Sequence, residues 1–262
     1  LPCLIVNCQR GGPGLGTIQP SQGDYFQACK GGGHGDYRLI VLAPASVQEM
    51  HDFVALGFDL AFKYRNPAMI LADGAIGQMM EKVVLAPQRP RKTNEEIAAE
   101  CRDWATYGKP ADRPRNVVTS LELQSEAMEK INLRLQAKYK AMEENEVRYE
   151  ALACDDADYV IVAFGSSARI CSATVEMARA EGIRLGMLRP ITLYPFPTRP
   201  IAELAARVKG FLSVELNAGQ MVEDVRLAVN GAVPVEHYGR QGGMIYSPDE
   251  VLAALKEKLI KA

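Results

Sequence analysis

A glycine-rich loop that contains one arginine is the part of this sequence best suited to chemistry. The loop, residues 9–17 (QRGGPGLGT), follows an apolar stretch typical of a buried strand in a parallel sheet. Backbone amides of such a loop can face an anion, and the planar guanidinium of Arg10 can bind a carboxylate or a phosphate through paired hydrogen bonds. The glycine spacing matches neither the dinucleotide-binding pattern nor the P-loop. On the residues alone, the loop is either an anion site or a tight turn that only connects two elements.

Two further places offer polar groups beside predicted strands. Asp73 and Gly74 stand at the carboxyl end of a predicted strand, where α/β sheets place ligands, and they can equally form a turn. Residues 165–167 (GSS) precede a predicted helix, so their amides could bind a phosphate or form a plain strand-to-helix turn. The histidines are too scattered along the chain to predict a metal centre: His34, His51 and His237.

The first half of the chain alternates between predicted strands and a helix. Strands are expected at residues 1–8, 37–43 and 68–72. Between the last two, Ser46 and Glu49 have the spacing of a capping box, which predicts a helix that ends near the proline at position 67. The crossover is long enough for parallel pairing. After this unit, residues 87–116 are polar and contain four prolines, which predicts a linker or an extended arm.

The second half continues the alternation. Residues 119–122 (TSLE) have capping-box spacing and predict a long charged helix that reaches about residue 153 and links two domains. Ser247 and Pro248 predict the start of the last helix. The other predicted strands are 159–164, 184–188, 211–216 and 233–238, with helices that end at 180 and span 201–208 and 220–229. This order predicts a mostly parallel sheet covered by helices on both faces.

Composition and charge bound the function. The 262 residues are 48% hydrophobic and 24% charged, as in an ordinary globular protein of one or two domains. Thirty Lys and Arg residues stand against 32 Asp and Glu, a formal charge of −2, so we expect no nucleic-acid partner. The sequence contains no apolar run approaching the ~20 residues that span a bilayer, so we expect no membrane association.

The cysteines and the start of the chain carry separate information. The cysteines include no C-x-x-C pair, which argues against a zinc ribbon, a thioredoxin-type motif or an iron–sulfur cluster on this chain and favours free thiols in a reducing cytoplasm. The six cysteines are Cys3, Cys8, Cys29, Cys101, Cys154 and Cys171.

The chain opens without methionine, inside a predicted strand, and this favours a fragment whose upstream residues are missing.

Four segments resemble one enzyme family, in the order in which that family has them. They are residues 7–25 (NCQRGGPGLGTIQPSQGDY), 42–50 (LAPASVQEM), 163–169 (AFGSSAR) and 188–197 (LRPITLYPFP). Together they are similar to the thiamine-containing chain of 2-oxoacid:ferredoxin oxidoreductases, and most similar to members that use 2-oxoisovalerate, a branched-chain acid. The resemblance covers nearly the whole chain.

The resemblance implies an α/β fold with a specific domain order. Residues 1–115 would be part of a thiamine-diphosphate-binding pyrimidine domain with its parallel sheet and the extended arm, residues 116–153 a linking helix, and residues 154–262 a transketolase C-terminal-like domain. Thiamine diphosphate with Mg²⁺ would be shared with a pyrophosphate-domain subunit, and coenzyme A would be the cosubstrate. Iron–sulfur clusters would lie on a ferredoxin-like subunit, ferredoxin would accept the electrons, and the assembly would be a hetero-oligomer or a homodimer through the second domain.

The resemblance also implies roles for residues of the loop. In relatives the arginine of this motif lies by the substrate carboxylate, so Arg10 inherits that role, with Gly11 and Gly12 allowing close backbone approach. Relatives that accept 2-oxoglutarate use a threonine nine residues beyond the arginine. Here that position is Gln19, while Thr17 stands two residues earlier, which agrees with an aliphatic substrate.

The resemblance leaves the catalytic residue unassigned. The glutamate that activates the thiamine lies upstream of this segment in the family, so we expect the chain alone to be inactive. The implied reaction converts a 2-oxoacid, coenzyme A and oxidised ferredoxin to acyl-CoA, carbon dioxide and reduced ferredoxin. Two alternatives remain: the E1 component of a 2-oxoacid dehydrogenase complex, which passes the acyl group to lipoamide, and a non-catalytic assembly subunit.

Overall fold

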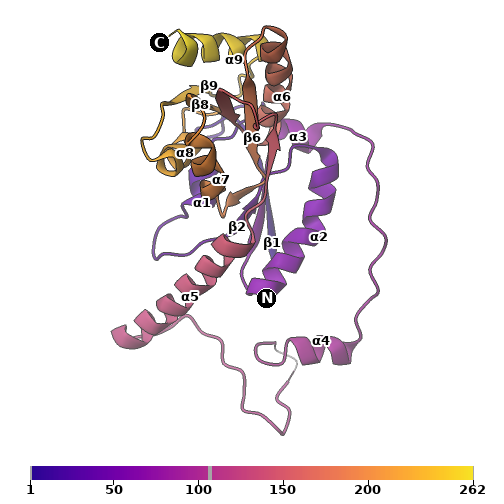
Figure 1. The fold of residues 1–262 in the computed structure, drawn as a ribbon. Coiled ribbons are helices and arrows are strands. Elements are labelled where there is room, and N and C mark those ends of the chain that lie inside the picture. The colour runs from indigo at the N-terminus through magenta and orange to yellow at the C-terminus, as the bar shows by residue number, and fades with distance from the viewer. Residues whose placement is uncertain (1, 106–107, 262) are drawn as a thin grey trace.

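Two mostly parallel sheets form the body of the protein (Figure 1). The computed structural model describes residues 2–105 and 108–261. The first sheet has the order β1-β3-β2-β7, with strands Leu4–Gln9, Ala68–Asp73, Ile40–Leu42 and Thr192–Tyr194. The second sheet has the order β4-β6-β5-β8-β9, with strands Tyr149–Leu152, Leu185–Pro190, Tyr159–Val162, Gly210–Glu215 and Val235–Gly239. In both sheets the one antiparallel partner, β7 or β4, lies at an edge.

Three helices accompany the first sheet: α1 (Tyr25–Cys29), α2 (Val47–Tyr64) and α3 (Gly74–Gln78). The predicted cap of α2 is confirmed, because the hydroxyl of Ser46 accepts a hydrogen bond from the amide of Glu49 at 3.1 Å. The helix ends at Arg65, whose left-handed φ of 46° closes it just before the proline at position 67. The α/β character expected for this half is confirmed.

The arm between the two halves leaves the body and returns to it (Figure 1). Its described residues, 79–105 and 108–124, include one short helix, α4 (Asn94–Glu100), capped by Thr93. The long helix α5 spans Ser125–Asn145, so its predicted start at residues 119–122 is wrong. The Thr119 hydroxyl accepts instead from the amide of Leu121, two residues on, which forms a local turn. The predicted end near residue 153 is also wrong, because residues 149–152 form β4.

The second sheet is covered by α6 (Gly165–Ala180), α7 (Thr198–Ala205), α8 (Met221–Val229) and α9 (Pro248–Leu255), which ends in a π-helical turn, Lys256–Ile260. The capping box predicted at Ser247 is confirmed, with Glu250 as its partner. No helix in the described ranges is long and apolar enough to cross a membrane.

The first strand departs from its prediction. A buried strand was expected over residues 1–8, of which Leu1 lies outside the described residues. The observed β1 is the edge strand of its sheet and pairs with β3 alone. Ile5 and Val6 are therefore 39% and 52% exposed.

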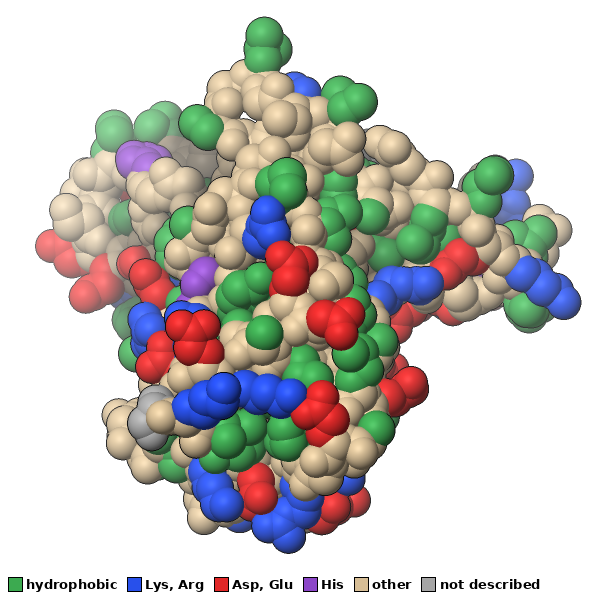
Figure 2. All heavy atoms as spheres, turned by 90° about the horizontal axis from the view of Figure 1, so that it is seen from above, with side chains coloured by type: hydrophobic (Ala, Val, Ile, Leu, Met, Phe, Trp, Pro, Cys, Tyr) green, Lys and Arg blue, Asp and Glu red, His purple; other side chains and the backbone are tan. Residues whose placement is uncertain are grey.

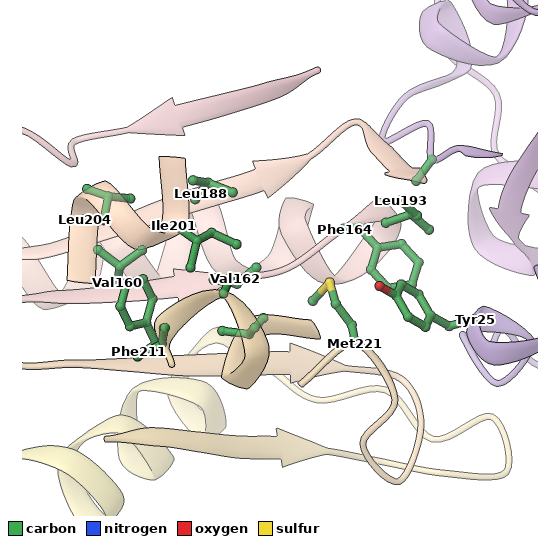
Figure 3. Close-up of a cluster of buried hydrophobic side chains, with 14 of the residues drawn as sticks. Tyr25, Val160, Val162, Phe164, Leu188, Leu193, Ile201, Leu204, Phe211 and Met221 are labelled. Atoms are coloured by element: carbon green, nitrogen blue, oxygen red, sulfur yellow. The ribbon is translucent and has the colours of Figure 1, made fainter. Parts of the chain in front are cut away.

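One hydrophobic cluster joins the two halves. Tyr25 of α1 packs against Phe164 with ring centroids 6.0 Å apart, and Met221 of α8 belongs to the same cluster (Figure 3). A buried ion pair adds to this contact, because the Arg189 guanidinium donates to both carboxylate oxygens of Glu49 at 2.6 and 2.8 Å. Since β7 also comes from the second half and completes the first sheet, the halves form one body.

The end of α5 is held by a buried carboxylate. Glu146 is 3% exposed and accepts hydrogen bonds from Lys63 at 2.6 Å, Tyr64 at 2.7 Å and Arg148 at 2.9 Å. Burial by itself would raise the pKa of Glu146, but these hydrogen bonds outweigh it and lower the pKa. The ionised carboxylate therefore stabilises the fold above the ordinary glutamate pKa of about 4.3, and this contribution is lost as the pH falls through the lowered value.

We expect Glu146→Gln to lower the free energy of unfolding at pH 7 by about 2 kcal/mol, the scale of hydrogen bonds to a charged group. The difference from wild type should shrink as the pH falls below about 4, because the wild-type carboxyl is then protonated as well. Urea titrations at several pH values measure both. Glu144→Gln, on an exposed residue of the same helix, is the matched control and should change little. A difference in the free energy of unfolding between Glu146→Gln and wild type that stays constant down to pH 2 would contradict this account.

Candidate functional site

The glycine-rich loop closes on itself at the carboxyl end of β1. The Gly11 amide donates to the Gln19 carbonyl at 2.9 Å, and the Thr17 amide donates to the Gly11 carbonyl at 2.7 Å. Arg10 also pairs with Pro20 as an isolated antiparallel bridge. The tip of the loop points away from the body, where Leu15 is 87% exposed. The loop is therefore a short, closed projection from the sheet edge at which α/β folds bind ligands.

The guanidinium of Arg10 is free to receive an anion. Within the described residues, the guanidinium makes a single, long hydrogen bond, from Nη1 to the Thr17 carbonyl at 3.5 Å. Across residues 2–105 and 108–261, no carboxylate forms an ion pair with Arg10. Because the side chain is exposed and unneutralised, its fork of donors can bind a planar carboxylate.

The two glycines after Arg10 face different surroundings. A Cβ added to Gly11 would lie 2.6 Å from the Thr17 hydroxyl and 2.7 Å from the backbone of Gly242. A Cβ added to Gly12 would meet nothing within 4 Å. Gly11 is thus required by a close contact, while the open side of Gly12 leaves room for a ligand.

Thr17 and Gln19 lie against the second half of the chain. The Thr17 hydroxyl donates its proton to the Gly242 carbonyl at 3.2 Å and accepts from the Gln19 amide at 3.3 Å. A Cβ on Gly243 would come within 2.4 Å of the Gln19 Cβ. In this arrangement both residues hold the loop in place, and the hydroxyl proton of Thr17 is used within the protein.

The structure brings together the two other polar places found in the sequence. The carboxylate of Asp73, 1% exposed, accepts from the Ser166 amide at 2.9 Å and from the Ser166 hydroxyl at 2.6 Å. It also caps α3 by accepting from Ala75 and Ile76. Residues 165–167 are the first residues of α6, and an internal carboxylate occupies this helix start, so the Ser166 amide is not available to a phosphate.

A chain of buried hydrogen bonds next to this contact was not predicted from the sequence. Gln22 donates to the Phe164 carbonyl at 2.8 Å and accepts from the Ser167 hydroxyl at 2.7 Å. The Tyr246 hydroxyl in turn donates to Ser167 at 2.5 Å, and burial raises the pKa of Tyr246 well above its usual value. Tyr246 is thus a neutral donor at every physiological pH. Only the tertiary fold brings these residues together, so no local signal marks them.

The histidines do not converge. His51 accepts from the amide of Ala86 at 3.2 Å, and His34 lies in a loop with φ of 56°. His237 lies 4.0 Å from the carboxylate of Glu215, and burial lowers the pKa of His237. Among the residues that the structure describes, no three His, Cys, Asp or Glu side chains are placed to hold a metal ion.

Two cavities lie away from the loop. The larger, about 1010 Å³, lies between the end of α5 and the start of α7, and the smaller, about 520 Å³, lies between α5 and the returning arm. Arg10 lines neither. The face seen from the α9 side carries basic and acidic side chains interspersed (Figure 2). The Arg10 loop therefore lies outside both of these cavities.

Family models match both halves of the chain. Residues 1–149 match the thiamine-diphosphate-binding domain of pyruvate flavodoxin/ferredoxin oxidoreductases, and residues 157–251 match core domain II of pyruvate:ferredoxin oxidoreductase. Ketoisovalerate oxidoreductase subunit VorB of Methanothermobacter thermautotrophicus is 49% identical over 98% of this chain and 71% of its own length. The chain belongs to the 2-oxoacid:ferredoxin oxidoreductase family. The family expected from the sequence is thereby confirmed.

Other members of the 2-oxoacid:ferredoxin oxidoreductase family are more distant. 2-Oxoglutarate synthase subunit KorA of Methanothermobacter marburgensis is 36% identical over 96% of this chain and 72% of its own length. The fold matches the solved 2-oxoglutarate:ferredoxin oxidoreductase from Magnetococcus marinus with a TM-score of 0.78 and 22% identity, over 98% of this chain and 48% of that one. A split-gene transketolase matches with a TM-score of 0.50, 14% identity and 85% of this chain. The expected thiamine-type α/β fold followed by a transketolase-like part is confirmed.

The residues present fit one side of a thiamine diphosphate site. The unpaired guanidinium of Arg10 and the open flank of Gly12 lie at the ligand-binding edge of the sheet. Asp73, at the same edge, already accepts hydrogen bonds on both oxygens and is not available to act on a cofactor. Arg10 and Gly12 are therefore open to a ligand at this edge, whereas Asp73 is not.

Proposed function

We propose that this chain is the pyrimidine-domain, or α-type, subunit of a 2-oxoacid:ferredoxin oxidoreductase that acts on branched-chain 2-oxoacids, foremost 2-oxoisovalerate. The observation that carries the proposal is the 49% identity, over 98% of the chain, to subunits named for ketoisovalerate. In the reaction a 2-oxoacid and coenzyme A yield acyl-CoA and carbon dioxide while oxidised ferredoxin is reduced.

Arg10 binds the carboxylate of the 2-oxoacid in this proposal. Its two parallel donors fix the direction of the acid, and the open flank of Gly12 admits the adjacent keto group. Bound thiamine diphosphate supplies the electron sink for loss of carbon dioxide. Because the carboxylate charge leaves during the reaction, Arg10 acts in binding and orientation, and Gly11, Thr17 and Gln19 hold the loop that carries it.

The proposed site is completed by partner chains. Both family relatives compared above are named as subunits, and Arg10 lines neither of the two cavities described above. We assign the facing wall, with the Mg²⁺ and the pyrophosphate of the cofactor, to a pyrophosphate-domain subunit, and the iron–sulfur clusters to a ferredoxin-like subunit. The six cysteines are all free thiols, which fits a reducing cytoplasm.

Substrate selectivity tests the proposal directly. Assayed with the complete complex, kcat/KM for 2-oxoisovalerate should exceed that for 2-oxoglutarate by about 100-fold. The second carboxylate of 2-oxoglutarate would have to be buried without a partner, which costs about 3 kcal/mol. The measurement is release of carbon dioxide across a panel of 2-oxoacids. A preference for 2-oxoglutarate would refute the branched-chain assignment.

The electron acceptor separates this proposal from an E1-type enzyme. With coenzyme A present, ferredoxin should be reduced in step with carbon dioxide release, and a lipoyl domain should not replace it. Acyl transfer to lipoamide without ferredoxin reduction would favour the E1 component instead. Neither result depends on which branched-chain acid is used.

A further inference from the structure

The turn between β9 and α9 contacts the loop that carries Arg10. Residues Gln241–Met244 form this turn, with the Met244 amide donating to the Gln241 carbonyl at 3.2 Å. Its central residues, Gly242 and Gly243, have φ of 64° and 93°, the left-handed region that favours glycine. The turn belongs to the second half of the chain, whereas the Arg10 loop belongs to the first.

The turn is tied to two helices of the second half, α9 and α6, through the residues on its two sides. Before it, Arg240 pairs with Glu250 of α9 at 2.7 Å. After it, Tyr246 is 2% exposed, and its hydroxyl donates to Ser167 of α6. Both flanks of the turn are thus held by contacts with helices of the second half.

The contact between turn and loop leaves no spare space. A methyl group on Gly243 would lie 2.4 Å from the Gln19 Cβ and 2.7 Å from the Thr17 hydroxyl. The Thr17 hydroxyl donates to the Gly242 carbonyl at 3.2 Å, and the Thr17 carbonyl accepts from the Arg10 guanidinium at 3.5 Å. A single residue thus connects the turn to Arg10.

We propose that the Gly242–Gly243 turn is a positioning element for substrate: it sets where the Arg10 guanidinium stands and thereby the affinity for the 2-oxoacid carboxylate. The inference rests on the proposed role of Arg10. The turn itself touches neither substrate nor cofactor. It acts through Thr17 and Gln19, whose side of the loop it supports.

Gly243→Ala in the complete complex is the first test. The added methyl must push the loop aside, so KM for the 2-oxoacid should rise about tenfold while kcat and KM for coenzyme A stay within about twofold. Gly182→Ala is the matched control, because it imposes similar left-handed strain, at φ of 82°, outside the turn and the loop, and a Cβ there meets nothing within 4 Å. Equal KM values for the two variants would overturn the proposal.

A second pair of variants tests the hydrogen bond without adding volume. Thr17→Val removes the donor to Gly242 and should raise KM severalfold, whereas Thr17→Ser keeps the donor and should restore a KM near wild type. If Thr17→Ser is as impaired as Thr17→Val, the hydrogen bond does not position the loop and this step of the proposal is refuted. If an Arg10→Ala variant raises KM but Gly243→Ala and Thr17→Val do not, the positioning role of the turn is refuted and the proposed role of Arg10 stands. If none of the three raises KM, the proposed function of the loop fails as well.

Discussion

Arg10→Ala in the assembled enzyme is expected to raise KM for the 2-oxoacid about 100-fold, with kcat changed by less than about fivefold. Truncating one partner of a hydrogen-bonded charge pair costs about 2–5 kcal/mol, which is about 30-fold to 5000-fold in affinity. The loss should fall on KM because the carboxylate charge is strongest in the bound ground state and leaves as carbon dioxide forms. The measurement is steady-state decarboxylation with coenzyme A and ferredoxin present.

Two further arginine variants make the Arg10 result specific. Arg10→Lys keeps the charge but loses the paired donors, so its KM should lie between those of wild type and Arg10→Ala. Arg199→Ala removes an exposed guanidinium that forms an ion pair with Glu203 on the same helix, and it should leave KM unchanged. An Arg10→Ala enzyme with wild-type KM would instead support the assembly-subunit alternative.

Asp73→Ala should destabilise the chain by about 4 kcal/mol, the largest stability effect we expect. The substitution leaves four buried donors without an acceptor: the amides of Ala75, Ile76 and Ser166 and the hydroxyl of Ser166. Unsatisfied buried donors cost about 1–3 kcal/mol each before the structure relaxes, and breaking a buried charged contact costs about 3–5 kcal/mol in total. For a chain of this size the melting temperature should fall by about 10 °C, as measured by circular dichroism or calorimetry.

Asp73→Ser separates the two roles of this carboxylate. Serine is a good helix cap and can still accept from the start of α3, but its shorter side chain cannot also reach the amide of Ser166. Asp73→Ser should therefore lower the free energy of unfolding by most of the amount by which Asp73→Ala lowers it. Thr93→Ala, which removes a cap in the exposed arm, should cost only about 1 kcal/mol. If Asp73→Ser is as stable as wild type, Asp73 stabilises the fold through its cap of α3 and not through its contact with Ser166.

Local patterns predicted the elements whose signals are local. The caps of α2 and α9 follow from serine and glutamate at fixed spacing, and the structure has both. The same spacing failed at residues 119–122, where the hydroxyl forms a local turn, and α5 begins at Ser125 without a side-chain cap. Strand β7 was missed because it is three residues long and pairs with a strand about 150 positions earlier, which no window along the sequence detects.

The candidate site shows the same division. Arg10 and its glycines follow from a contiguous motif, so sequence resemblance was sufficient to propose them. The support from Gly242 depends on a contact across 225 positions, and Asp73 finds its partner Ser166 across 93. Each of these residues is unremarkable locally, and only the packed halves give it a role.

The joining of the two halves limits how this site can open. A strand from the second half completes the first sheet, one apolar cluster includes both halves, and Arg189 is tied to Glu49 across their boundary. Enzymes that open by a hinge move two such halves apart to admit substrate. In this chain the same motion would break the pairing of β7 with β2 in the first sheet. If Arg10 binds the acid as proposed, entry and exit of the acid depend on rearrangement of the short loop around Arg10 and on movement of the proposed partner subunit.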